Sequence, residues 1–413
     1  MTTGGIKRLR RIQLFQEATA TKGTADEATA ILRALGTIEN LGEPYFPDED
    51  IGYLVDVNRA CLPFQLAQLE IEDNPATFEQ LPYYFSGGIK LLGTGVADGG
   101  GTGKIYSYPV SYVNPVNDFQ TYTIEGGDNE EMEVMSYGIV QKITLSGKPK
   151  EPWMVSATVQ GRNAARNKVA VAAAVFVTGG AGACLITSAA NDLASFLIGM
   201  KIRIEGAAVA GDNGIKTVTA SAAGSLTIAE VIPGEGAVAV TIQQDFSGAA
   251  LPVVECINFS KTQLFIGEPA GAFGDGENAN TILGFSCEIN TGIQPMFAGS
   301  GYKYFPYAAL VNPSITLDMT LIHNGEATDE KQLMQDGTAR LVRIQALGTA
   351  LTIAGVYTYK TVFLDIPGMW SKWNKIGEEE GNDIIECTLR AGYDSTAAKY
   401  ATMTVVNQLA TLP

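Results

Sequence analysis

The chain has 413 residues, of which 46% are hydrophobic and 17% are charged. This composition supplies enough apolar material for folded cores and too few charges for a disordered chain. At roughly 100–200 residues per domain, the length predicts two to four domains. Asp and Glu total 44 against 28 Lys and Arg, giving a formal net charge of −16. Such a surface repels phosphate, which argues against a conventional nucleic-acid-binding protein that relies on Lys and Arg.

The numbers and positions of glycine and cysteine narrow the fold type and the cellular compartment further. The 46 Gly and 17 Pro stand between short apolar runs, which favours many short strands joined by turns. The five cysteines are far apart and form no CxxC pair, so we expect free thiols in a reducing cytoplasm. They are Cys61, Cys184, Cys256, Cys287 and Cys387.

Neither an export signal nor a membrane segment is expected. The basic residues between Lys7 and Arg11 are followed by polar residues instead of an apolar stretch. The longest apolar run, residues 169–186, is interrupted by Thr178 and several glycines. A membrane span needs about 20 mostly apolar residues with fewer glycines, so buried strands are predicted there.

The N-terminal region begins with a predicted helix. Thr24-Ala25-Asp26-Glu27 has the pattern of a capping box, and apolar residues up to Leu35 then fall on one helical face before Gly36. A strand over residues 66–71 and a second short helix over 77–85 follow. The next strands are predicted over residues 121–125, 137–145 and 153–159, the last two joined by a turn as a hairpin.

The middle of the chain, residues 164–246, differs in composition from both flanks. It is rich in Ala, Gly, Val and Ile, and its short β-patterned runs recur every 8–12 residues or so, which predicts an inserted small sandwich or barrel. We expect it to leave through Ser247-Gly248, small residues suited to a surface connection. The predicted domains are therefore 1–163, 164–246 and 247–413. The runs cover residues 175–178, 185–188, 201–205, 215–219, 226–229 and 238–242.

Residues 247–413 return to the pattern of residues 1–163, in which strands alternate with turns and a short helix. A helix capped by Thr328 and ended near Gly337 is predicted among its strands. The strand 315–321 with the helix 329–335 parallels the earlier strand 66–71 with the helix 77–85, so we predict an internal duplication. The predicted strands cover residues 262–266, 282–289, 315–321, 341–347, 357–366 and 384–389.

The sequence contains no recognisable catalytic motif. His323 is the single histidine, so a multi-histidine metal centre is impossible, and no GxSxG motif accompanies it. The segment Gly99–Lys104 resembles a phosphate loop, but Asp98 replaces the first glycine and Ile105 the magnesium-binding Ser/Thr. It is therefore predicted to be a loop.

Acidic clusters are the remaining candidates for a catalytic or metal-binding site. Glu130-Glu131-Glu133 and Glu378-Glu379-Glu380 could form a carboxylate pair only if they faced one another across a cleft, and such runs are usually solvated. Asp275–Asn278 and Gly211–Gly214 lack the spacing of a calcium loop. No catalytic, cofactor-binding or metal-binding residue is predicted. Trp153, Trp370 and Trp373 are expected in cores or interfaces.

Several segments resemble one known family when they are read in order. They are residues 121–129, Tyr137-Gly138, residues 143–147 and 153–157, the N-terminal Gln16-Glu17 with residues 22–25, residues 78–83, and the closing segments Gly381-Asn382 and 391–394. Together they are similar to major tail tube proteins of long-tailed bacteriophages (siphophages).

This resemblance implies a β-sandwich or barrel with short flanking helices, stacked in rings of sixfold or pseudo-sixfold symmetry. It implies a virion protein assembled in the host bacterial cytoplasm. The implied partners are further copies of the chain, a tape measure protein, tail terminator and tail tip proteins, and double-stranded DNA that passes without specific binding. An acidic wall would suit such a channel. Two halves of about 150 residues favour three copies per ring over six. The inserted block departs from the simplest members and resembles small β-domains that decorate phage structural proteins.

Two other classes remain open. A secreted or surface-attached β-sandwich adhesin or carbohydrate-binding protein would explain the strands and the acidity, although no export signal or paired cysteines are seen. An acidic polysaccharide hydrolase is the third alternative.

Overall fold

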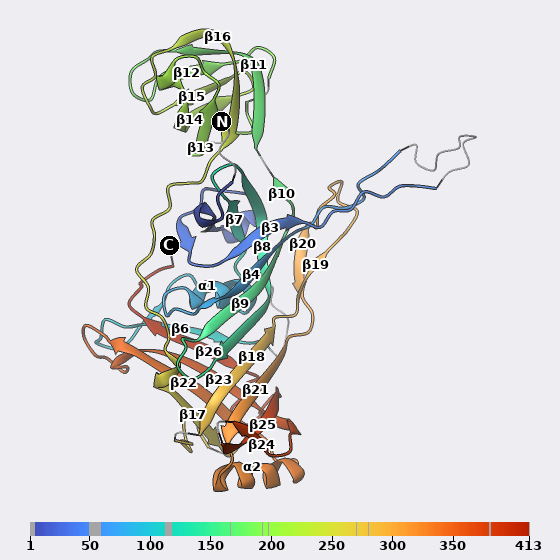
Figure 1. Ribbon diagram of the computed structural model, residues 1–413, viewed down its shortest axis with the longest axis vertical. Coiled ribbons are helices and arrows are strands. Elements are labelled where there is room, and N and C mark those ends of the chain that lie inside the picture. Colours follow the sequence, from blue (N-terminus) through green and yellow to red (C-terminus); the bar gives the residue numbers. More distant parts are fainter. Residues whose placement is uncertain are drawn as a thin grey trace.

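The computed structural model describes residues 5–48, 59–111, 118–165, 167–191, 193–196, 198–269, 271–279, 281–379 and 381–412. Within these residues the chain is mostly β, as predicted, with 26 strands and two α-helices. The molecule is elongated, with a small barrel at one end of a larger β-body (Figure 1). Short 3-10 turns cover Lys7–Leu9, Thr19–Thr21, Ala210–Asp212 and Phe259–Lys261.

The first part of the body is built around one long bent strand, β8. Its elements are β1 (Arg11–Gln16), β2 (Ala30–Leu32), β3 (Gly36–Asn40), β4 (Ala67–Pro75), α1 (Leu81–Gly88), β5 (Val96–Ala97), β6 (Lys104–Pro109), β7 (Tyr122–Gly127), β8 (Met132–Gly147), β9 (Met154–Gly161) and β10 (Ala164–Ala165). The N-terminal half of β8 pairs with β7 and β10, and its C-terminal half pairs with β9. One strand is thus shared between two sheets that enclose the core.

The predicted helix between Thr24 and Leu35 is wrong. Ala30 and Leu32 lie in β2, which pairs with β1, and both are buried while Leu35 is 56% exposed. The buried residues Ala28, Ala30 and Leu32 instead follow a period of two, which is the period of a strand. The strand interpretation prevails because β1 offers backbone hydrogen bonds that only an extended partner can accept.

The middle segment forms a closed six-stranded barrel with its own apolar core. Its strands are β11 (Lys168–Val177), β12 (Cys184–Thr187), β13 (Lys201–Glu205), β14 (Gly214–Ala222), β15 (Ser225–Ile228) and β16 (Glu235–Gln244), and each overlaps one predicted run. Ala164 and Ala165 precede the barrel and pair with β8 in the body. The exit differs from the expected surface connection, since Ser247 is buried and its hydroxyl donates to the backbone oxygen of Ala28.

The last part of the chain is built around a second long bent strand, β23. Its elements are β17 (Thr262–Gly267), β18 (Ile282–Asn290), β19 (Ile293–Met296), β20 (Tyr307–Leu310), β21 (Ser314–Ile322), α2 (Gly325–Gln335), β22 (Arg340–Ala350), β23 (Tyr359–Trp373), β24 (Gly377–Glu379), β25 (Asn382–Ala391) and β26 (Thr402–Asn407). The N-terminal part of β23 pairs with β22 and β26, and its C-terminal part pairs with β25.

The pairing order of the first part is repeated in the last part. The first part has the order β1-β7-β8-β9-β4-β3, and the last has β17-β22-β23-β25-β21-β18. In both, a helix follows the fifth strand of this order, and a further strand, β10 or β26, pairs with the long bent one. The body therefore consists of two structural repeats, with the barrel inserted at the junction between them.

Helix α2 begins earlier than predicted. Asn324 caps it by accepting a hydrogen bond from the backbone nitrogen of Ala327 at 2.9 Å, and Thr328 lies inside the helix. The helix ends before Gly337, whose φ of +68° favours glycine, as expected. A buried cluster holds α2 on the sheet, because Glu330 accepts from both Arg340 and the indole nitrogen of Trp370.

Replacing residues 168–243 with a short Gly-Ser linker should leave the body folded. The two ends are adjacent, since the backbone nitrogen of Gln244 donates to Asn167 at 2.8 Å, and loop closure adds little free energy. The linker removes Arg203, which donates to the backbone oxygen of Asn129 and pairs with Asp245. Calorimetry should nevertheless show the unfolding transition of the body near its original midpoint. Aggregation of this variant, when a variant that keeps the barrel is soluble, would contradict the prediction.

Candidate assembly interface

The two repeats join in one continuous sheet. The C-terminal half of β8 pairs antiparallel with β18, from Phe285 opposite Gly147 to Asn290 opposite Lys142. This junction produces an eight-stranded sheet in the order β3-β4-β9-β8-β18-β21-β25-β23, of which each repeat supplies four strands. Its strands run from the centre of the body toward α2 (Figure 1).

The two faces of this sheet differ sharply. Alternate residues such as Leu69, Ile143, Cys287 and Leu317 are buried in the main core. The intervening residues are almost all polar, as expected when one sheet face meets water. They include Thr37, Glu39, Gln68, Glu70, Lys142, Thr144, Ser146, Ser156, Thr158, Gln160, Ser286, Glu288, Asn290, Thr316, Asp318, Thr320, Lys372, Glu386, Thr388 and Arg390.

The polar face carries an excess of negative charge. The five carboxylates of this set outnumber its three cationic side chains, Lys142, Lys372 and Arg390. Hydrogen bonds link side chains from strand to strand, for example from Thr158 to Glu70 at 2.9 Å and from Asn374 to Glu386 at 2.7 Å. The face is thus a broad hydrophilic surface on a rigid support.

An ion pair and an aromatic cluster stabilise the junction between the repeats. The ammonium of Lys142 lies 2.8 Å from the carboxylate of Glu288, and this hydrogen bond holds the pKa of Glu288 below its usual value. The segment between β18 and β21, which contains β19 and β20, packs back on the first repeat. There the Phe305 ring meets that of Tyr137 edge to face, and Ile139 is buried.

The continuous sheet has two open edges. β3 pairs with β4 on one side only, and residues 369–373 of β23 pair with β25 on one side only, within the part of the chain that the structure describes. Unpaired backbone groups at an edge are a template for another strand. The sequence predicted a strand over residues 66–71, but not which strands end the sheet.

The other sequence candidates lie apart from one another. His323 lies between β21 and α2, and its backbone nitrogen donates to Asp383. The Gly99–Lys104 segment is a turn between β5 and β6, as predicted, and no helix follows it. The carboxylate of buried Asp98 accepts from the backbone of Val356 and Tyr357, so the turn is held against a neighbouring loop and differs from a phosphate cradle.

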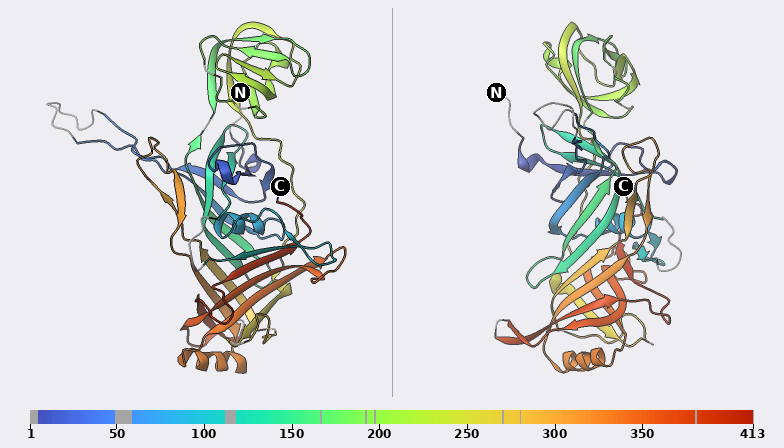
Figure 2. Two further views of the ribbon diagram at one scale, coloured as in Figure 1. Left: turned by 180° about the vertical axis from the view of Figure 1, so that it is seen from behind. Right: turned by 90° about the vertical axis from the view of Figure 1, so that its right-hand side faces the viewer.

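The acidic clusters do not form a carboxylate pair. Glu130 and Glu131 lie in the turn between β7 and β8, while Glu378 lies in β24 near the opposite end of the body (Figures 1 and 2). Glu380 lies outside the described residues. No group of three or more potential metal ligands occurs among the described residues, and Glu277 and Asp212 instead accept hydrogen bonds from Gln263 and Gly234.

The predicted positions of the tryptophans are largely confirmed. Trp153 is fully buried and its indole nitrogen donates to the Thr262 hydroxyl at 2.8 Å. Trp370 is buried beside Trp373, which is half-buried, and their rings meet edge to face.

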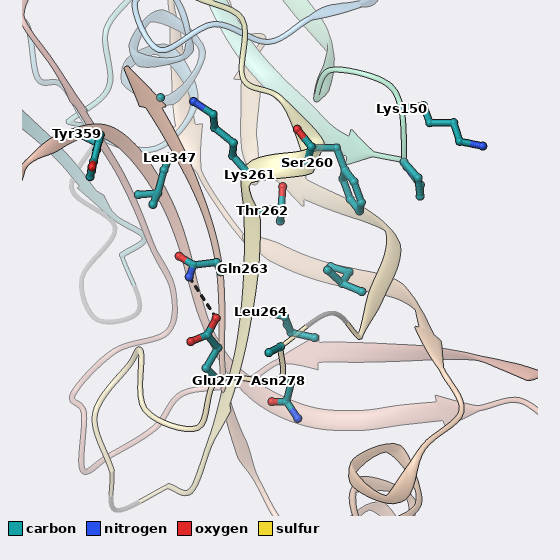
Figure 3. Close-up of a pocket in the computed structure, with 15 residues that line it drawn as sticks. Lys150, Ser260, Lys261, Thr262, Gln263, Leu264, Glu277, Asn278, Leu347 and Tyr359 are labelled. Atoms are coloured by element: carbon teal, nitrogen blue, oxygen red, sulfur yellow. Dashed lines mark hydrogen bonds between the residues drawn. The ribbon is translucent and has the colours of Figure 1, made fainter. Parts of the chain in front are cut away.

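An open groove of about 750 Å³ runs beside β17. Its floor includes Gln263, whose amide donates to Glu277 at 3.1 Å (Figure 3). Lys150 and Lys261 also line it, but no second carboxylate lies among the lining residues. The groove therefore lacks the paired acids of a glycoside hydrolase.

Comparison of the sequence with known proteins identifies no family for this chain. The sequence matches no model of a known protein family and no curated protein. None of the described helices has the length and apolar character needed to span a membrane.

The two faces of the sheet should respond differently to truncation. Ile289→Ala should lower the free energy of unfolding by about 2–4 kcal/mol, because it leaves a cavity at the junction of the repeats. Thr144→Ala, on the polar face of the opposite strand, should change it by less than about 0.5 kcal/mol. Urea unfolding followed by circular dichroism measures both. Equal effects would contradict the assignment of the faces.

Proposed function

We propose that this protein is the structural subunit of a long-tailed phage tail tube, whose rings stack into a hollow tube that carries genomic DNA to the host. The observation that supports this proposal best is the eight-stranded sheet, which is polar on one face and open at both edges. Repeated around an axis, such a sheet closes into a wall with no free edge. The ordered resemblance of residues 121–157 to tail tube proteins supports the same assignment.

The internal duplication bears on the number of subunits. Each chain already contains two repeats joined edge to edge, so three chains would supply six repeats in a pseudo-sixfold ring. Contacts of this kind are head to tail, as ring symmetry requires. We therefore favour three copies per ring, assembled in the bacterial cytoplasm. A tape measure protein would occupy the growing tube, and terminator and tip proteins would bind its ends.

The polar face of the sheet is proposed as the lumen wall. Most of its side chains are short or acidic, and its net charge is negative, so phosphate would meet few cations to displace its counterions. The barrel is proposed to lie outside the tube. It is attached through β10 and residues 245–247, which are not part of the eight-stranded sheet.

The purified protein should form rings or long hollow rods visible by negative-stain microscopy, with or without a tail initiator complex. Native mass spectrometry of the rings should give three subunits, and a six-subunit ring would reject that stoichiometry. Compact monomers across a range of salt and protein concentrations, even after addition of virion tails, would contradict the tube. An adhesin is expected to stay monomeric and to bind cells or glycans instead.

DNA should pass the wall without binding it. Assembled rings should show no retention of short duplex DNA at physiological salt. Changing Thr144, Ser286 and Thr316 of the polar face to Lys should produce salt-sensitive retention, because three new cations per chain would release counterions. Electrophoretic mobility shifts measure the effect. A matched variant with three Lys residues on the barrel, at Thr187, Ser225 and Thr241, controls for added charge alone. Equal retention by both variants would argue against the lumen assignment.

A further inference from the structure

We infer that β23 of one copy pairs with β3 of the next copy, in the register that β18 and β8 use inside each chain. The inference rests on the proposed function, because it takes the partner to be a second copy in a ring. It goes further by naming the strands, the register and an ion pair.

The long bent strands align through a shared irregularity. Pairing of β8 with β9 skips Gln141, and pairing of β23 with β25 skips Ser371. A skipped residue of this kind, a β-bulge, marks one fixed position in a strand. Superposing the two bulges places Lys142 on Lys372 and Thr144 on Asn374. The correspondence continues past β23, since the backbone nitrogen of Asn374 donates to Glu386 of β25.

The first strands of the two four-stranded units align in the same way. Leu69 of β4 and Leu317 of β21 are both fully buried and occupy corresponding positions, opposite Val159 and Leu389. Ile38 lies opposite Leu69, and Cys287 lies opposite Leu317. Counting along the strands from these pairs places Glu39 of β3 on Glu288 of β18.

These alignments bring charged residues into register. Inside the chain, Lys142 and Glu288 form the ion pair across the junction. Their counterparts at the open edges are Lys372 and Glu39, both exposed, and neither makes an ion pair with another described residue. Pairing of one copy with the next would unite them in the same geometry. The register also places Glu39 opposite Asn374, as Glu288 lies opposite Thr144 inside the chain.

An exposed apolar side chain supports the same partner. Met369 corresponds to Ile139, which is fully buried beneath the segment between β18 and β21. Met369 is 48% exposed. The corresponding segment of the first repeat connects β3 to β4, and in a neighbouring copy its described residues 41–48 and 59–66 would lie over Met369. One docking geometry therefore pairs the edges, joins the charges and covers this side chain.

Cysteine cross-linking tests the register. In a background with Cys61→Ser and Cys256→Ser, the pair Glu39→Cys and Asn374→Cys should form disulfide-linked dimers and trimers on mild oxidation of the rings. Facing residues of neighbouring strands come close enough for such a bond. The internal counterparts Thr144→Cys and Glu288→Cys should cross-link within one chain, and they set the oxidation conditions.

A displaced pair serves as the negative control. Thr37→Cys with Lys372→Cys is four residues out of register and should give several-fold less cross-linking between chains. Rings that form but cross-link no better with the matched pair than with the displaced pair would overturn the inference and leave the proposed function intact. If the unmodified chain forms no rings under any condition, the proposed function fails as well. Thermal unfolding confirms that each variant is folded.

Charge reversal tests the ion pair separately. Glu39→Lys or Lys372→Glu alone should weaken association between copies about fivefold at low salt, because each places like charges opposite one another. The double variant should recover most of that loss. A double variant as weak as the two losses combined would show that the side chains do not meet. Sedimentation at several protein concentrations provides the measurement.

Discussion

Backbone hydrogen bonding at the edges of a β-sheet is the constraint on which this structure depends. Every strand carries donors and acceptors along both sides, and those that lack a partner strand invite association. The chain meets this requirement once internally, where β18 lies on the edge of β8. It leaves the two outer edges open, at β3 and β23. Unpaired backbone donors and acceptors, of the kind that pair where the two repeats join, thus remain at both edges of the eight-stranded sheet.

The bent strands explain how each repeat contributes both to an enclosed core and to the eight-stranded sheet. Because β8 and β23 each belong to two sheets, their N-terminal halves close the sandwich and their C-terminal halves extend the shared sheet. Helix α1 packs on the body beside β8, and α2 is held on β23 through Glu330 and Trp370. The core fixes the orientation of the wall, so a hydrophilic surface can be displayed without loss of rigidity.

The barrel contributes nothing to this sheet. It has its own apolar core and a closed ring of strands, which leaves no open edge. Its insertion at the junction of the two repeats, after β10, leaves the pairing of each repeat complete. We therefore expect that the barrel can be removed without altering the eight-stranded sheet.

Much of this architecture was determined by the sequence alone. Alternating apolar residues and turn residues predicted most strands, the separate middle segment and the repeated order of strand and helix, because these patterns are local. The helix expected after Thr24 failed because β1 offers a partner strand for Ala30 and Leu32, and no local pattern indicates that pairing. The expectation that the chain lacks catalytic residues also came from single residues such as His323, and it stays a prediction.

Only the tertiary structure decided which strands are neighbours and which are left at the edges. Lys142 and Glu288 lie far apart in the sequence, and no local pattern indicates that they meet across a junction. Nor could the sequence show that Lys372 and Glu39 occupy the corresponding places at the open edges, because that relation depends on the register of several pairings at once. Local preferences are written in a few consecutive residues, whereas strand order follows from long-range hydrogen bonds and the burial of one sheet face.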